Sequence, residues 1–275
     1  MKHLKPVSLS LLSLSMVAMA ACTASPASDT TKEDGSKDVA AAKTPAATIV
    51  TQSTTPQYDV VKRTEAAVID GSADDEVWST VQDISGTFHY PWEDKEAPVT
   101  VFKAYNDGTN LYFLFDVTDP DVLVDEEWKD DESTVDNEDR AELFFAGGPV
   151  DKPGADGMPL YYGVEVDPDG RVHDYSLEYY RKFDGTWNLE GMETAGQTTD
   201  GGYVVEGKIP LKSLEDLGLI NDDNVMRTGV YRAEFSKNPD GDEPIMEWIS
   251  WVNPKTEAPD YHVDSSFGEF RILEN

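Results

Sequence analysis

The feature that most constrains this fold is a period of two in its apolar residues, which recurs between turn signals from residue 58 onward. In the stretch 139–146, DRAELFFA, every second residue is apolar, and Arg140, Glu142 and Phe144 occupy the alternate positions. Successive side chains of a strand point to opposite faces, so this alternation indicates a strand with one face in a core. Similar runs predict strands at 99–106, 110–117, 160–166, 171–180, 202–210, 230–237, 245–252 and 267–273.

Turn residues between these runs indicate hairpins. The segments 107–109 and 167–170 contain Gly or Pro-Asp-Gly, which suit tight connections between antiparallel strands. Only 211–217 has a helical pattern, and Gly218 would end that helix. We therefore predict an all-β domain at 58–275, an antiparallel β-sandwich of the immunoglobulin-like or jelly-roll kind, with about ten strands and one short helix.

The N-terminus predicts export and a lipid anchor. Two lysines precede a short apolar run that ends in small residues, so residues 1–21 are typical of a signal peptide. Ala20-Ala21-Cys22 resembles a bacterial lipobox, which implies lipidation of Cys22, the only cysteine in the chain. Residues 22–57 lack aromatic residues and predict a disordered tether. Thr23 favours, by the same resemblance, the outer membrane of a Gram-negative cell envelope.

The net charge excludes one class of partner. With 22 Lys and Arg against 54 Asp and Glu, the formal charge is -32, so phosphate backbones would be repelled and nucleic acid is not an expected partner. The sequence contains no H-E-x-x-H, G-x-S-x-G, G-x-G-x-x-G or phosphate-loop motif. A glycosidase needs only two carboxylates that are close in space, so a hydrolase remains possible on these grounds.

Acidic residues concentrate between Asp116 and Asp139, where twelve carboxylates accompany one lysine. Calcium prefers about six to eight oxygen ligands from carboxylates, carbonyls and water. Binding of a cation would also relieve the mutual repulsion of these side chains. The sequence therefore predicts a structural calcium ion, with candidate ligands Asp119, Asp121, Asp125, Asp136 and Asn137.

Several aromatic residues lie outside the strand alternation, namely Trp92, Trp128 and Tyr261. The apolar face of a pyranose stacks on such rings, and its hydroxyls donate hydrogen bonds to nearby carboxylates. These residues are therefore candidates for sugar contact. Trp78, Trp248 and Trp251 lie within or beside apolar patterns, and at least two of them are predicted to belong to the core.

An ordered series of motifs resembles the carbohydrate-binding module family 9-like domains, which are relatives of the DOMON sandwich. The resemblance covers about residues 60 to 273. Its motifs, in order, are AVIDGSADDEVWS at 67–79, VTVFKAYNDGTNLYFLFDVTDPDV at 99–122, EDRAELFF at 138–145, GGYVVEGKIPLKSL at 201–214, and ISWVNP at 249–254 followed by FGEFRI at 267–272.

The resemblance implies a sugar held between two aromatic rings. Trp128 and Tyr261 match the places of those two rings, and Glu142 matches a strand glutamate that accepts sugar hydroxyls. Glu165 stands on the next predicted strand, where the family's sugar binders carry other polar residues, and is taken as a second acceptor. Bound calcium is common in these modules, in agreement with the acidic loop.

We therefore predict a non-catalytic, lipid-anchored protein that captures an oligo- or polysaccharide and supports polysaccharide catabolism. A rival hypothesis is haem-based electron transfer, as in DOMON relatives, with Met158, Met192, Met226 or His173 as ligands. A hydrolase with an unrecognised carboxylate pair and a calcium-dependent adhesion or scaffold protein are two further hypotheses. The candidate carbohydrate-binding residues are Trp128, Tyr261, Glu142, Glu165 and Trp92.

Overall fold

Twelve strands pair side by side into one mixed sheet, in the order β7-β6-β5-β4-β10-β12-β1-β2-β3-β9-β8, with β11 on β10. Nine of these strands were predicted, whereas β1, β7 and β8 were not. The computed structural model describes residues 55–125, 127–150, 160–178, 182–241 and 244–275. The predictions for the signal peptide, for Cys22 and for the tether up to residue 54 lie outside these residues. The strands are β1 Gln57–Lys62, β2 Thr100–Asn106, β3 Asn110–Thr118, β4 Arg140–Ala146, β5 Tyr161–Val166, β6 Val172–Glu178, β7 Lys182–Asp184, β8 Glu193–Thr199, β9 Gly202–Pro210, β10 Val225–Ser236, β11 Ile245–Ser250 and β12 Gly268–Ile272.

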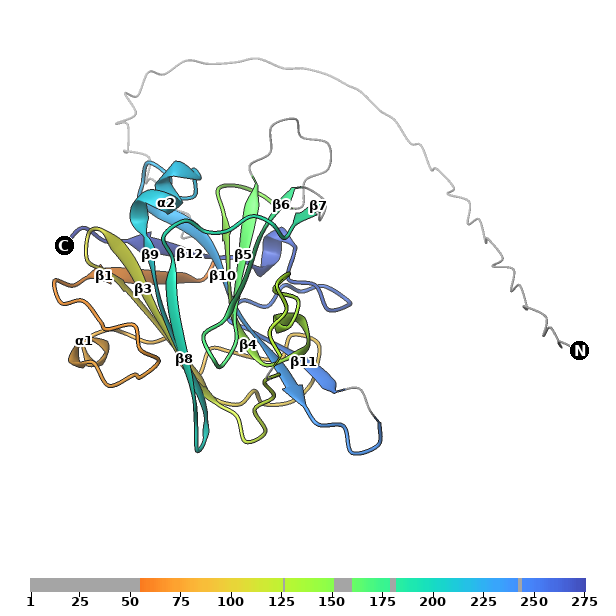
Figure 1. The fold of residues 1–275 in the computed structure, drawn as a ribbon. Coiled ribbons are helices and arrows are strands. Elements are labelled where there is room, and N and C mark those ends of the chain that lie inside the picture. Colours follow the sequence, from red (N-terminus) through yellow and green to blue (C-terminus); the bar gives the residue numbers. More distant parts are fainter. Residues whose placement is uncertain (1–54, 126, 151–159, 179–181, 242–243) are drawn as a thin grey trace, which may run out of the picture. The chain divides into compact units, whose positions relative to one another are not determined.

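The sheet curls so that its two halves face each other. In Figure 1, β4, β5, β6 and β10 lie on one side, and β3, β8 and β9 lie on the other. The all-β prediction is confirmed. The prediction of a purely antiparallel arrangement needs a correction, because β1 joins the two halves by running parallel to both β12 and β2.

Short helical segments complete the described fold. They are α1 Glu76–Ser79, η1 Val135–Asn137, α2 Leu211–Asp216 and η2 Asp264–Ser266. The predicted helix corresponds to α2, and Gly218 follows it with a positive φ of 69°. The helix α1 was not predicted. No helix in the described part of the chain is long and apolar enough to span a membrane.

The main core lies between the two halves of the sheet. Phe102 on β2 packs against Phe115 on β3, with ring centroids 4.9 Å apart, and against Phe270 on β12 at 5.8 Å. Leu143 and Phe145 of β4 reach the same core from the opposite half. The apolar positions of the period-two pattern therefore point inward, as predicted.

The alternate positions of β4 are buried as well, because loops cover the outer face of this half. Phe144 is opposite Gly163 on β5 and Gly229 on β10. A Cβ at Gly163 would come within 2.4 Å of the Tyr175 ring, and one at Gly229 within 2.1 Å of the Tyr231 hydroxyl. The two glycines thus leave room for an aromatic cluster on this outer face, with Phe144, Tyr161, Tyr175, Tyr231, Tyr261 and Phe267 among its members.

A third cluster covers the outer face of the other half around Trp78. The Trp78 ring packs edge-on against Tyr105 at 5.1 Å. Its indole Nε1 donates a 2.7 Å hydrogen bond to the buried carboxylate of Glu206 on β9, which also accepts from the backbone N–H of Gly71 at 3.1 Å. Burial raises the pKa of Glu206, and these donors oppose that rise.

Substitution Glu206→Ala should destabilise the protein, because it leaves the buried N–H groups of Trp78 and Gly71 without an acceptor. Each unpaired donor costs about 1 to 3 kcal/mol, so we expect the free energy of unfolding in urea to fall by about 2 to 5 kcal/mol. Glu65→Ala, at an exposed position, should change it by less than about 0.5 kcal/mol. A similar loss in both variants would contradict this role of Glu206.

Candidate functional site

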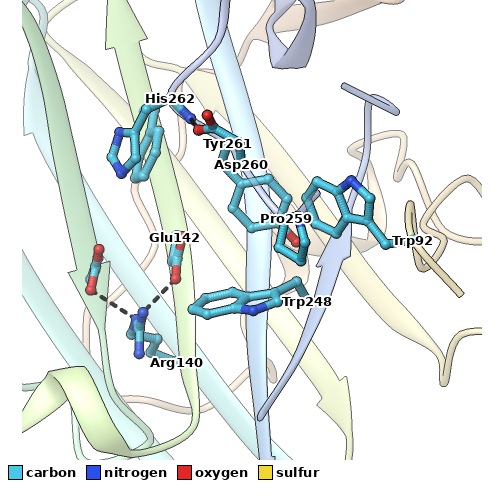
Figure 2. Close-up of a pocket in the computed structure, with 10 residues that line it drawn as sticks. Trp92, Arg140, Glu142, Trp248, Pro259, Asp260, Tyr261 and His262 are labelled. Atoms are coloured by element: carbon cyan, nitrogen blue, oxygen red, sulfur yellow. Dashed lines mark hydrogen bonds and ion pairs between the residues drawn. The ribbon is translucent and has the colours of Figure 1, made fainter. Parts of the chain in front are cut away.

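A cavity of about 220 Å³ opens on the outer face of the sheet, above the aromatic cluster. Strands β4, β5 and β11 contribute its floor, and the segments 88–98 and 252–263 contribute its rim. In Figure 2, the rings of Trp248, Tyr261 and Trp92 lie on one side of the open space, with Arg140 and Glu142 on the other. The lining residues are Trp92, Arg140, Glu142, Phe144, Glu165, Trp248, Pro259, Asp260, Tyr261 and His262.

The aromatic side of the cavity is fixed by ring packing. Tyr261 stacks on Tyr231 with centroids 4.2 Å apart and planes at 19°, and it is only 6% exposed. Trp92 lies 5.4 Å from Tyr261, and its Nε1 donates to the backbone oxygen of Thr256 at 3.1 Å. Trp248 meets Tyr261 edge-on at 5.8 Å and is partly exposed. The rings are therefore held in place by their neighbours, with Trp248 and Trp92 open to a ligand.

The polar side is built around a buried cation. Arg140 Nε lies 2.9 Å from Glu142 Oε1 and 2.8 Å from Glu165 Oε2, and all three side chains are buried. The guanidinium also lies over the Trp248 ring, at 5.5 Å from the centroid. Glu142 and Glu165 are cross-strand partners on β4 and β5, so the arginine neutralises charges that would otherwise repel each other.

The local electrostatics follow from this burial. Loss of hydration raises the pKa of Glu142 to about 8, Arg140 opposes the rise, and the nearby Glu165 adds to it. Burial also raises the pKa of the Tyr261 hydroxyl well above its ordinary value. The cavity therefore combines flat apolar rings with carboxyl oxygens and contains no excess of positive charge among its described lining residues.

The structure brings together most of the predicted carbohydrate-binding residues. Tyr261, Glu142, Glu165 and Trp92 all line this cavity. Trp128 does not line it. Its ring is 39% exposed in the segment between β3 and η1, where the guanidinium of Arg171 lies 5.3 Å from the ring centroid. The structure does not pair Trp128 with Tyr261 as two facing rings.

Trp248 and Arg140 were not predicted as binding residues. Trp248 was a candidate for the core because it lies in an apolar run, and it instead packs edge-on against Tyr261 at the cavity. Arg140 and Phe144 share the alternate face of β4 with Glu142, so the period-two pattern already placed them beside a predicted acceptor. What the pattern could not show is that loops cover this face.

The predicted calcium ligands do not gather at one point. Asp119 is buried near Arg232, whereas Asp121 accepts a hydrogen bond from the backbone N–H of Lys237 at 3.1 Å. Asp136 lies 3.3 Å from Nδ1 of His173. Asp125 and Asn137 border another shallow cavity. The acidic loop is therefore spread over several environments.

Two groups of described residues each offer three ligand atoms that could hold a metal, all within 4.8 Å of one another. One group is Asp136, Glu165 and His173, and the other is Asp119, Asp139 and Glu234. The second group is entirely buried, and Oδ2 of Asp119 accepts no hydrogen bond from any described residue. Burial raises the pKa of Asp139 to about 8 and that of Glu234 to about 7.

The candidate haem ligands lie in separate places. Met226 is fully buried in the main core, and Met192 packs at the edge of the same core. His173 lies on the outer face beside Asp136. Met158 lies outside the described residues.

Comparison with known proteins relates the chain to carbohydrate-binding domains. A family model described as carbohydrate family 9 binding domain-like matches residues 69–275. No curated protein sequence matches the chain. A crystal structure of a proposed carbohydrate-binding protein from Bacteroides uniformis has 16% sequence identity and a TM-score of 0.57, over 80% of this chain and 100% of the other.

A family 9 carbohydrate-binding module from Caldicellulosiruptor kristjanssonii is also similar, in two solved structures. Its complex with cellotriose has 18% identity and a TM-score of 0.53, over 79% of this chain and 93% of the other. Its complex with glucose has 18% identity and a TM-score of 0.53, over 80% of this chain and 97% of the other. At this identity the structural matches show a shared fold.

Substitution Arg140→Ala should leave two buried carboxylates unpaired. We expect the free energy of unfolding at pH 8.5 to fall by about 3 to 5 kcal/mol in urea titration. The loss should shrink at pH 6, because the raised pKa of Glu142 lets that group take up a proton in the folded protein below about pH 8. Lys212→Ala, which removes an exposed and solvent-screened ion pair with Asp216, should change the free energy of unfolding far less. A loss for Arg140→Ala as small as that for Lys212→Ala would contradict the buried pairing.

Proposed function

We propose that this chain, which belongs to the carbohydrate family 9 binding domain-like family, is a non-catalytic protein. It captures a saccharide in the cavity beside Trp248 and Tyr261. The observation that carries the proposal is one small cavity in which aromatic rings and carboxylates face the same space. Aromatic rings accept the apolar C–H face of a sugar, and carboxylates accept hydrogen bonds from its hydroxyls.

Each side chain has a distinct part in the proposed site. Trp248 is the ring against which the sugar stacks, because it is partly exposed and the Arg140 guanidinium lies over the ring and holds it. Tyr261 supports Trp248 from the side. Glu142 and Glu165 accept hydroxyl hydrogens while Arg140 keeps both in place. Because these partners are already positioned, little side-chain ordering accompanies binding.

The affinity should be modest. One or two stacked rings and a few hydrogen bonds at a partly open site correspond to a Kd of roughly 1 μM to 1 mM, or ~4 to 8 kcal/mol. The complexes of the Caldicellulosiruptor module with glucose and cellotriose make these two sugars the natural first probes. Such an affinity suits a capture protein that passes its ligand to degrading enzymes.

We also propose that the protein is exported and anchored through a lipid on Cys22. The support is the sequence of residues 1–22, in which a signal-like apolar run ends at the only cysteine of the chain. The segment from Cys22 to the start of β1 at Gln57 would then act as a tether between the outer membrane and the binding domain. Capture of polysaccharide fragments at the cell envelope agrees with this placement.

Calcium is the proposed ion for the buried group of Asp119, Asp139 and Glu234. The group fits a hard divalent cation, because it offers three carboxylates and a buried Asp119 oxygen that accepts no hydrogen bond from the described residues. Asp119 and Asp139 lie at the two ends of the acidic loop. Arg232 already ion-pairs with Asp119 and Glu234, so a bound ion would add a second positive charge that holds these ends together. Of the ligands predicted from sequence, only Asp119 belongs to this group.

Substitution Trp248→Ala should weaken binding of cellotriose by about tenfold or more, which corresponds to about 1.4 kcal/mol in titration calorimetry. Trp248→Phe should retain part of the affinity, because it keeps a ring. Ile245→Ala, on the same strand, exposed and outside the cavity, should bind like the wild type. Unchanged binding in Trp248→Ala, with the melting temperature preserved, would reject this cavity as the site.

Calcium should raise the melting temperature. At 100 times its Kd a ligand adds about 2.7 kcal/mol, or about 5 to 10 °C for a domain of this size. EDTA should reverse the increase, and Asp119→Asn should largely remove it. Asp121→Asn, which alters an exposed carboxylate near Lys237, should leave the increase intact. The same melting temperature in calcium and in EDTA would contradict the proposal.

A further inference from the structure

A second, larger cavity of about 600 Å³ adjoins the proposed sugar cavity. Glu165 and His262 line both cavities, so these two side chains form the boundary between them. His262 is held there by stacking on Phe144, with centroids 5.1 Å apart. A chain-like ligand that leaves the first cavity past His262 would enter the second one directly.

The second cavity has its own exposed aromatic ring. Phe183 on β7 is 54% exposed and lies 4.8 Å from the ring of Tyr175 and 5.8 Å from that of His173. Most other large apolar side chains in the described fold are buried, so an open phenyl ring beside a cavity is a candidate contact surface. A Cβ at Gly185 would come within 2.7 Å of Phe183 Cε1, so this glycine leaves the space that the ring occupies.

Polar side chains line the same cavity. Asp131, Ser133, Asp136 and Thr186 line the second cavity. Carboxylates and hydroxyls of this kind accept hydrogen bonds from sugar hydroxyls. Three carboxylates, those of Asp131, Asp136 and Glu165, outnumber the two histidines among the described lining residues, so the cavity would repel a carboxylated sugar. The second cavity thus repeats the chemistry of the first, with one ring and several oxygen acceptors.

The sizes of the two cavities argue for a ligand longer than one sugar. Sites for small molecules of drug size are typically about 300 to 1,000 Å³. The first cavity, at about 220 Å³, is below that range and suits a single sugar ring. The second cavity, at about 600 Å³, has room for the following units.

We propose that the second cavity is a further sugar-binding subsite in which Phe183 stacks on a sugar unit, and that the ligand is a neutral oligosaccharide whose terminal unit occupies the first cavity. This inference rests on the proposed function and adds the length and charge class of the ligand. Tyr175 links the two subsites, because its hydroxyl donates a 2.7 Å hydrogen bond to Glu165 while its ring packs against Phe183.

Titration calorimetry with glucose, cellotriose and trigalacturonic acid tests the subsite. The wild type should bind cellotriose more tightly than glucose and should not bind trigalacturonic acid. Phe183→Ala should weaken cellotriose binding by about two- to tenfold, the contribution of one aromatic contact, and should leave glucose binding unchanged. Phe183→Tyr should restore cellotriose binding, because it keeps the ring.

Val68→Ala is a matched control, because Val68 is 60% exposed and lines neither cavity. If Phe183→Ala leaves cellotriose binding unchanged while Trp248→Ala abolishes it, the proposed function stands and the second subsite is wrong. An equal loss for glucose and cellotriose in Phe183→Ala, at an unchanged melting temperature, would also overturn the subsite. Binding of trigalacturonic acid as tight as that of cellotriose would overturn the charge class. Absence of sugar binding by the wild type would overturn both proposals.

Discussion

The outer face of this sheet depends on the contact of Arg140 with Glu142 and Glu165. Two carboxylates on adjacent strands, both removed from water, would destabilise the pairing of β4 with β5 unless a cation lay between them. The same guanidinium lies over the ring of Trp248. One side chain therefore holds the two strands, the two carboxylates and the Trp248 ring in a fixed relation, which is the preorganisation that the proposed weak sugar site requires.

Burial of that face also depends on residues with no side chain at all. Gly163 and Gly229 flank Phe144 in the strand register and leave room for Tyr175 and Tyr231. Tyr261 can then stack on Tyr231 and carry the segment 252–263 over the sheet. The outer face of β4 is thereby covered by the segment 252–263, and a cavity lies between this segment and the strand.

The sequence predicted the strands whose apolar residues alternate, such as β3, β4 and β9, because the period-two signal is local. It did not predict β8, whose residues ETAGQTT carry no such signal and pair only because β9 is beside them. For the site, Tyr261 and Glu142 followed from the family resemblance and line the cavity. The place of Trp128 depended on the path of the acidic loop, which long-range contacts determine, and composition alone does not encode it.

The parallel strand β1 has a consequence for how the protein is made. Gln57 on β1 hydrogen-bonds to Glu269 on β12, across 212 positions of sequence. The two halves of the sheet are joined only through β1 and its neighbours, so the seam stays open until β12 has been synthesised. Each half can pair its own strands earlier, whereas the seam between β1 and β12 joins segments that are far apart in sequence and should close late in folding.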